Sequence, residues 1–294
     1  MTAERTVPWR AVGLFAVLAL GGAWLASLPL HLGGGLQNPH FFVVGAVVMT
    51  TPTLAALMTV FGVLRPANPR EVLGLVGPLS WRRTALRALA AAGGGIVLAA
   101  AAMLVAGAAG LVDLRVNPDA SSSLLAIPLT TVVIGVTAVG EEIGWRGFLF
   151  HALRPLGPVR ANLLNGALWG LWHAPLLLLG YNYGTTSPVS IPLMVLSTVL
   201  IGTLLAWVRE STGTVWAGAL AHGAMNASTS LLLAAFLVPA QQGSEATVLA
   251  WPGWVVLALA IAVVHRRRGT PLDGPVLVDA SARRDTHPQD APAG

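Results

Sequence analysis

The sequence contains no cysteine and few charged residues. Without cysteine the chain cannot form disulfides, thiolate zinc sites or cysteine-ligated iron–sulfur clusters, and it cannot use a cysteine nucleophile. Charged residues make up 10% of the chain, whereas a soluble domain is usually about a quarter charged. Hydrophobic residues make up 55%, and the mean hydropathy is +0.72. The composition therefore predicts a membrane protein.

Lysine is absent as well, so all 17 basic residues are arginine, a bias typical of a GC-rich genome rather than of a function. The net charge is only +5, and the arginines lie in loops beside apolar runs. This distribution is typical of membrane topology and not of a phosphate-binding stripe. The lipid bilayer is therefore an expected partner, and nucleic acid is not.

Long apolar runs make up most of the sequence. Each has the length of about 17–25 residues that a helix needs to cross the hydrocarbon core. They predict an all-α, polytopic membrane helical bundle of about eight transmembrane helices. The first run lacks a clear small-x-small cleavage site, so we interpret it as an uncleaved span. The eight runs are residues 11–30, 41–64, 86–110, 122–145, 161–180, 189–208, 214–238 and 249–265.

The arginines assign the two sides of the membrane. They precede the first run and follow the second, fourth, sixth and eighth, whereas the alternate loops contain only Arg115. By the positive-inside rule both termini are cytoplasmic. We expect a multi-pass protein of the cell membrane, in particular the bacterial cytoplasmic membrane.

Two stretches lie outside the expected bundle. Residues 65–85 mix arginines, prolines and Trp81, and we expect them along the cytoplasmic interface. Residues 269–294 are rich in proline, aspartate and alanine, which is typical of a disordered cytoplasmic tail. The transmembrane domain is therefore predicted to span residues 1–268.

Polar residues concentrate in three of the runs. Of 12 acidic residues, only Glu141 and Glu142 belong to a run or its immediate end. Because side chains four residues apart share a helical face, three polar or aromatic pairs each form a stripe. The pairs are Glu142 with Arg146, Trp169 with His173, and His222 with Asn226. Polar groups in a bilayer face the bundle interior, so we expect the fourth, fifth and seventh runs to form a common cavity.

Each feature alone has a structural interpretation. A single histidine is often a packing residue, the Glu142–Arg146 pair could be an interfacial ion pair, and Asn226 could join helices. Gly166 and Gly170 form a GxxxG, which predicts close helix packing rather than chemistry. Two carboxylates, two imidazoles and an amide in three runs are nevertheless difficult to explain as separate accidents of packing.

Several activities fit such a set. A carboxylate and a neutral imidazole can activate water, while a second imidazole and an amide can stabilise an oxyanion. Two histidines and a glutamate can also hold catalytic zinc, although the HExxH signature is absent. A proton- or ion-coupled transporter is a further alternative, because buried Glu/His sets also form ion pathways.

Three motifs resemble those of the CAAX protease and bacteriocin-processing family (CPBP, also called Abi) of membrane endopeptidases, which includes the type II CAAX prenyl endopeptidase. "GEEIGWRGFL" resembles EExxxR, "WGLWH" resembles FxxxH with Trp169 in place of phenylalanine, and "HGAMN" resembles HxxxN. Each motif alone is weak, and their order along the chain makes the set specific to this family. The resemblance covers a catalytic core of about residues 122–235.

The resemblance implies an intramembrane endopeptidase that cuts a peptide or membrane-protein substrate near the cytoplasmic face. Glu141 and His173 would activate the water, and His222 and Asn226 would stabilise the oxyanion. Glu142, Arg146 and Trp169 would support the site. No cofactor and no metal ligand is predicted, with a metal-dependent variant as the alternative. Adjacent helical residues point about 100° apart, so one glutamate is expected to be catalytic and the other structural. Nothing in the sequence identifies the substrate or recognises a prenyl group.

Overall fold

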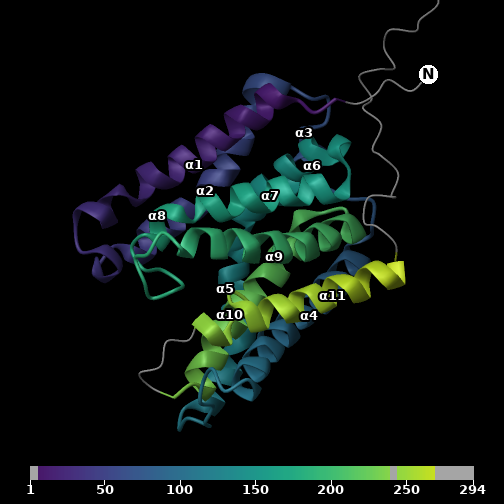
Figure 1. The fold of residues 1–294 in the computed structure, drawn as a ribbon. Helices are drawn as coiled ribbons and strands as arrows, with labels where there is room; N and C mark the ends of the chain where they lie inside the picture. Colours follow the sequence, from purple (N-terminus) through teal and green to yellow (C-terminus); the bar gives the residue numbers. More distant parts are fainter. Residues whose placement is uncertain (1–5, 239–243, 269–294) are drawn as a thin grey trace, which may run out of the picture.

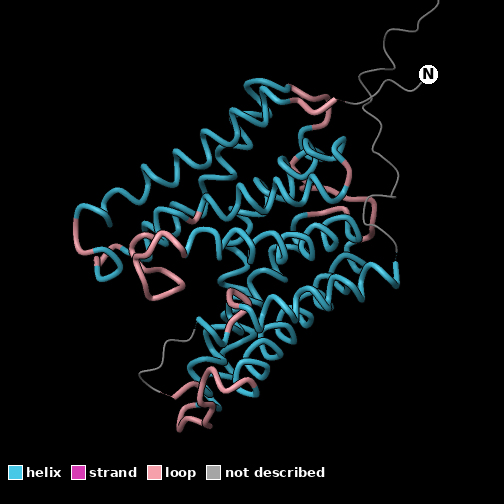
Figure 2. The backbone as a smooth tube through the Cα atoms, viewed as in Figure 1, coloured by secondary structure: helices cyan, strands magenta, loops and turns pink. Residues whose placement is uncertain are grey.

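The computed structural model describes residues 6–238 and 244–268, and within these ranges the chain is all-helical with no strand (Figure 2). One isolated β-bridge joins Leu114 and Leu237. The all-α prediction is confirmed for this part of the chain. The tail predicted at 269–294 lies outside the described residues.

Long helices account for most of the described chain. They are α1 (Trp9–Leu32), α2 (Phe41–Thr59), α4 (Trp81–Ala108), α5 (Ala120–Glu142), α7 (Pro158–Trp172), α9 (Ser190–Thr212), α10 (Val215–Phe236) and α11 (Trp251–Arg268). Short helices complete the chain: η1 (Gly35–Gln37), η2 (Val60–Leu64), α3 (Pro69–Val72), η3 (Ile143–Leu149), α6 (Phe150–Leu153), η4 (Arg154–Leu156), α8 (Ala174–Leu177) and η5 (Ser244–Ala246).

Six helical segments of the described chain are long and apolar enough to cross a membrane. They coincide with the first, second, third, fourth, sixth and eighth predicted runs. The protein is therefore a multi-pass membrane protein. The six segments are Trp9–Leu32, Phe41–Leu64, Trp81–Ala108, Ala120–Leu156, Ser190–Thr212 and Ser244–Arg266.

The fifth and seventh predicted runs differ from these six. The fifth run, 161–180, is not one continuous helix, because α7 ends at Trp172 and the short helix α8 follows His173. Pro175 has no backbone N–H to continue the hydrogen-bond ladder of α7. The seventh run is helical as α10, but it carries His222, Asn226 and several serines and threonines. It is a core helix that packs against α4 and α5.

The helices pack in pairs. Helix α1 packs on α2, α5 on α10 and α7 on α9, and α10 also contacts α4. In Figure 1, α7 and α9 run side by side between α1 and α11. Many apolar side chains on the outer faces of the bundle remain exposed, among them Phe42, Leu125 and Leu129. Such a surface suits contact with lipid rather than with water.

Glycines allow the close packing of α7 on α9. A Cβ atom on Gly166 would lie 2.5 Å from the Cα of Val199, and one on Gly170 would lie 2.5 Å from the Cα of Val195. Only glycine leaves room for this approach, so the close helix packing predicted from the GxxxG is confirmed.

The loop after α3 packs against η3 and the start of α10. The Gly74 carbonyl accepts a hydrogen bond from the Val215 N–H at 2.9 Å, and the Leu75 carbonyl accepts one from the Trp216 indole at 3.0 Å. A Cβ atom on Gly147 would overlap the Leu73 carbonyl oxygen. Part of the stretch expected along the interface, residues 65–85, therefore packs against η3 and the start of α10.

The α7–α9 contact gives a first prediction. Gly166→Ala should lower the free energy of unfolding by about 1–3 kcal/mol, because the added methyl group overlaps Val199. Gly94→Ala on α4 is the matched control, because nothing lies within 4 Å of its Cβ. That change should be neutral or stabilise the helix by up to about 1 kcal/mol. Thermal unfolding in detergent measures both, and equal midpoints for the two variants would contradict the packing described here.

Candidate active site

Glu142 forms the centre of a buried charged group. Its Oε1 lies 3.1 Å from Nη1 of Arg146 and 3.1 Å from Nδ1 of His222. Glu142 is 0% exposed and Arg146 1% exposed. An ionised carboxylate only accepts hydrogen bonds, so we place a proton on Nδ1 of His222. The interaction joins the end of α5 and η3 to α10.

Glu141 contacts a different helix. Its Oε2 accepts a 2.7 Å hydrogen bond from Nε1 of Trp169 on α7. Both side chains are buried. The two adjacent glutamates thus point to different partners, Glu141 to α7 and Glu142 to α10, in agreement with the directions expected of neighbouring helical residues.

His173 is held by the last turn of α7. Its Nδ1 lies 2.8 Å from the Trp169 carbonyl oxygen. A carbonyl can only accept, so Nδ1 carries the proton and Nε2 of a neutral ring keeps its lone pair. The ring of Trp172 packs edge-on against His173, with centroids 4.7 Å apart. The imidazole is therefore fixed in tautomer and in orientation.

Trp169 connects Glu141 and His173 to the charged group around Glu142. The guanidinium carbon of Arg146 lies 3.8 Å from the centroid of the Trp169 ring, a cation–π contact. The same ring packs edge-on against His222, with centroids 5.4 Å apart. In addition, Glu141 interacts electrostatically with His222 and Arg146. Four of the predicted site residues therefore contact Trp169, and Glu142 joins them through its contacts with Arg146 and His222. The four are Glu141, Arg146, His173 and His222.

Asn226 stands apart from the other predicted site residues. It lies one turn after His222 on α10 and is half-buried. Among the described residues, its side chain has no hydrogen bond to the other predicted site residues. It lies on the same face of α10 as His222.

Two glycines make room for the charged group. A Cβ on Gly218 would lie 3.2 Å from Oε2 of Glu142, and one on Gly202 would lie 3.4 Å from Nη2 of Arg146. These two atoms, Oε2 and Nη2, are buried and have no hydrogen-bond partner among the described residues. Helices α9 and α10 therefore close tightly over Glu142 and Arg146.

Some supporting residues were not predicted from the sequence. Asn165 donates to the Trp145 carbonyl at 2.7 Å, and Trp172 donates to the Thr51 hydroxyl at 3.0 Å. Asn165 lies one turn before Trp169, so helical spacing could have identified it. The contact of Trp172 with Thr51 joins residues 121 positions apart, and no sequence pattern indicates it.

The arrangement offers a carboxylate and a free imidazole nitrogen beside a second imidazole. Such a set can remove a proton from water and donate to a developing negative charge. No group of three or more His, Cys, Asp or Glu side chains in the described ranges is placed to hold a metal ion.

Comparisons with known proteins point to one family. Residues 121–228 match the family model of Rce1-like type II CAAX prenyl endopeptidases. CAAX prenyl protease 2 of Methanococcus maripaludis is 39% identical to the chain over 49 residues, which is 16% of this chain and 18% of that protein. The matched part is thus less than a fifth of the relative's length. The family match runs from α5 into α10 and contains all seven predicted site residues.

The buried charged group gives a second prediction. Arg146→Ala should lower the free energy of unfolding by about 3–5 kcal/mol, because it removes the arginine partner of the buried Glu142 carboxylate. Arg83→Ala is the control, because Arg83 is an exposed helical arginine on α4, and it should cost less than about 0.5 kcal/mol. Thermal unfolding measures both. A small effect for Arg146 would contradict a stabilising role of the pair.

Proposed function

We propose that the chain is a CAAX-type intramembrane endopeptidase that hydrolyses a peptide bond near the cytoplasmic face. The match of residues 121–228 to the Rce1-like family model supports this proposal. The observation that carries this proposal is the contact of Glu141 and His173 with the same residue, Trp169. These contacts hold the Glu141 carboxylate and the His173 imidazole beside the last turn of α7.

Glu141 and His173 activate the attacking water. Oε2 of Glu141 is held by the Trp169 indole, which leaves Oε1 to accept a proton from the water. Nε2 of His173 accepts the second hydrogen bond of the same water. A base fixed by its neighbours loses little entropy on reaching the reactive geometry.

His222 and Asn226 stabilise the tetrahedral intermediate. To donate to the oxyanion while its Nδ1 contacts Glu142, the imidazole of His222 must carry protons on both nitrogens. Glu142 neutralises this imidazolium, and Arg146 holds Glu142 in place. The Asn226 amide supplies a second donor from the same face of α10.

The proton and electron balance is that of simple hydrolysis. The water oxygen attacks the carbonyl carbon as its proton moves to Glu141, and the carbonyl electrons move to the oxygen. When the intermediate collapses, the C–N bond breaks and Glu141 returns the proton to the leaving amine. No side chain forms a covalent intermediate.

The proposed topology has eight spans, with α7–α8 and α10 completing the six long apolar segments, and both termini in the cytoplasm. The helical ends that carry Arg146, Arg209 and Arg266 then face the same side. The proposed membrane domain is residues 1–268.

The proposed substrate is a peptide or membrane protein reached within the bilayer of the cytoplasmic membrane of a bacterium. The proposed mechanism uses no metal, because base and oxyanion roles divide naturally between the two pairs of residues.

The proposal predicts that Glu141→Gln abolishes cleavage. Loss of a general base typically costs about 10²–10⁴-fold in rate, and the amide cannot accept the proton. Glu71→Gln is the matched control, because Glu71 lies in an exposed loop helix and bonds Asn68. Quantitative proteomics of membranes that contain wild-type protein, Glu141→Gln or Glu71→Gln would detect precursors that accumulate only with Glu141→Gln.

Two outcomes would overturn this mechanism. Near-wild-type processing by Glu141→Gln would remove Glu141 from its role as base. Stoichiometric zinc in the purified protein, lost together with activity on chelation, would replace the metal-free mechanism by the metal-dependent alternative.

Trp169 gives a further prediction. Trp169→Phe keeps the ring under Arg146 but removes the N–H that holds Glu141, so cleavage should fall by roughly tenfold. Trp169→Ala removes both contacts and should reduce cleavage far more. The two variants are compared by the cleavage rate at equal amounts of folded protein. Equal rates for the two variants would show that the aromatic ring makes no contribution.

A further inference from the structure

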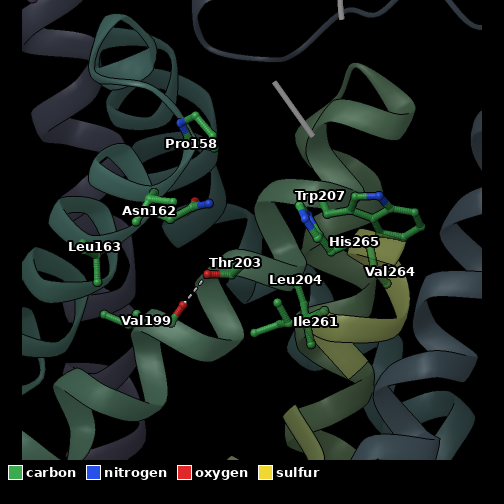
Figure 3. Close-up of a pocket in the computed structure, with 11 residues that line it drawn as sticks. Pro158, Asn162, Leu163, Val199, Thr203, Leu204, Trp207, Ile261, Val264 and His265 are labelled. Atoms are coloured by element: carbon green, nitrogen blue, oxygen red, sulfur yellow. Dashed lines mark hydrogen bonds between the residues drawn. The ribbon is translucent and has the colours of Figure 1, made fainter. Parts of the chain in front are cut away.

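A cleft lies beside the contact between α7 and α9. The two helices touch at Gly166 and Gly170, and residues from the N-terminal half of α7 and the C-terminal half of α9 line a cavity of about 230 Å³. Helix α11 forms the third wall. Figure 3 shows Pro158, Asn162 and Leu163 of α7 on one side, with Trp207 of α9 and His265 of α11 opposite.

The deeper walls are apolar and the cleft lies outside the candidate active site. Val199, Leu204 and Ile261 line it, and the hydroxyl of Thr203 is already bonded to the Val199 carbonyl at 2.8 Å (Figure 3). The residues of α7 and α9 that contact the charged group, Trp169 and Gly202, are not among those that line the cleft. An occupant would therefore need an apolar body.

One end of the cleft is cationic. Pro158 begins α7, while Trp207 and His265 lie near the C-terminal ends of α9 and α11, so these three residues share one end of the bundle. The exposed arginines Arg160 and Arg266 directly adjoin this end in the sequence.

We propose that this cleft binds one anionic phospholipid, with an acyl chain between α7, α9 and α11 and the phosphate beside Arg160, His265 and Arg266. A water molecule occupies about 30 Å³ in the liquid, so 230 Å³ holds roughly eight groups of that size, such as methylenes. The cleft therefore accommodates part of one acyl chain, and the headgroup stays at the cationic end. The charge complementarity selects an anionic headgroup over a zwitterionic one.

The site does not depend on the proposed protease activity, and lipid retention tests it directly. The full chain is reconstituted in vesicles of equal phosphatidylglycerol and phosphatidylcholine, extracted in detergent and examined by native mass spectrometry. The wild type should retain one phosphatidylglycerol, preferred by roughly thirtyfold, because each arginine near an anionic surface contributes about fivefold. Millimolar inorganic phosphate should leave this lipid bound, since the acyl chain supplies much of the affinity.

Variants separate the two parts of the site. Val264→Trp and Leu204→Trp each fill the cleft and should abolish retention, whereas Val263→Trp, on an exposed neighbour that does not line the cleft, should not. Arg160→Gln with Arg266→Gln should remove the headgroup preference. Arg115→Gln, in a loop at the opposite end, should keep it. A thermal midpoint equal to that of the wild type verifies that each variant is folded.

Several results would overturn the proposal. These are wild-type retention in both cleft-filling variants, equal retention of the two lipids by the wild type, and displacement of the lipid by phosphate. A dimer mass that Val264→Trp abolishes, without retained lipid, would assign the cleft to a second copy of the chain.

Discussion

The burial of two adjacent carboxylates inside an apolar bundle is the constraint on which the rest of the structure depends. A buried ionised carboxylate without partners is strongly destabilising, so the fold must bring cations and donors to it. Glu142 receives Arg146 from its own helix and His222 from α10, and Glu141 receives the indole N–H of Trp169 from α7. Three parts of the chain are thereby fixed relative to one another by charge rather than by apolar contact, which in lipid offers little driving force.

The backbone around these residues is shaped to allow the contacts. After Glu142 the helix widens into the π-helical segment Ile143–Leu149, a form often found at functional sites. Gly144 and Gly147 in this segment lie against Pro52 and the Leu73 carbonyl, where no side chain would fit. The segment can therefore sink into the bundle with Arg146 facing inward. Larger residues at these glycines would force η3 away from α2 and would withdraw Arg146 from Glu142.

The sequence predicts the local part of this arrangement better than the distant part. The spacing of Glu142 and Arg146 predicts their ion pair, because residues four apart share a helical face, and the pair forms. The apolar runs predict nearly all the long helices, because each is long enough to cross the hydrocarbon core as a helix. The contact of His222 with Glu142 joins positions 80 residues apart, and composition alone could indicate only that both would face the bundle interior.

Trp169 shows where sequence reasoning was incomplete. An aromatic residue at this position was expected to support the site, but its N–H contact with Glu141 depends on how α7 crosses α5. The fifth run was predicted as one span, yet α7 ends at Trp172, and this end allows His173 to fold back onto the Trp169 carbonyl. A continuous helix would have used that carbonyl in its own ladder. The tautomer of His173 therefore follows from the break in the helix, which hydropathy does not register.

Helices α7 and α9 connect the charged group to the lipid-facing side of the bundle. Trp169 and Gly202 contact the charged group, whereas Asn162 and Thr203 line the cleft. An occupant of the cleft would press on α7 and α9, while the glycine contact resists their separation. Because Trp169 holds Glu141 at a distance of 2.7 Å, even a small rotation of α7 would change the position of that carboxylate. The close packing of α7 on α9 at Gly166 and Gly170 therefore holds Trp169, and with it the carboxylate of Glu141, in position.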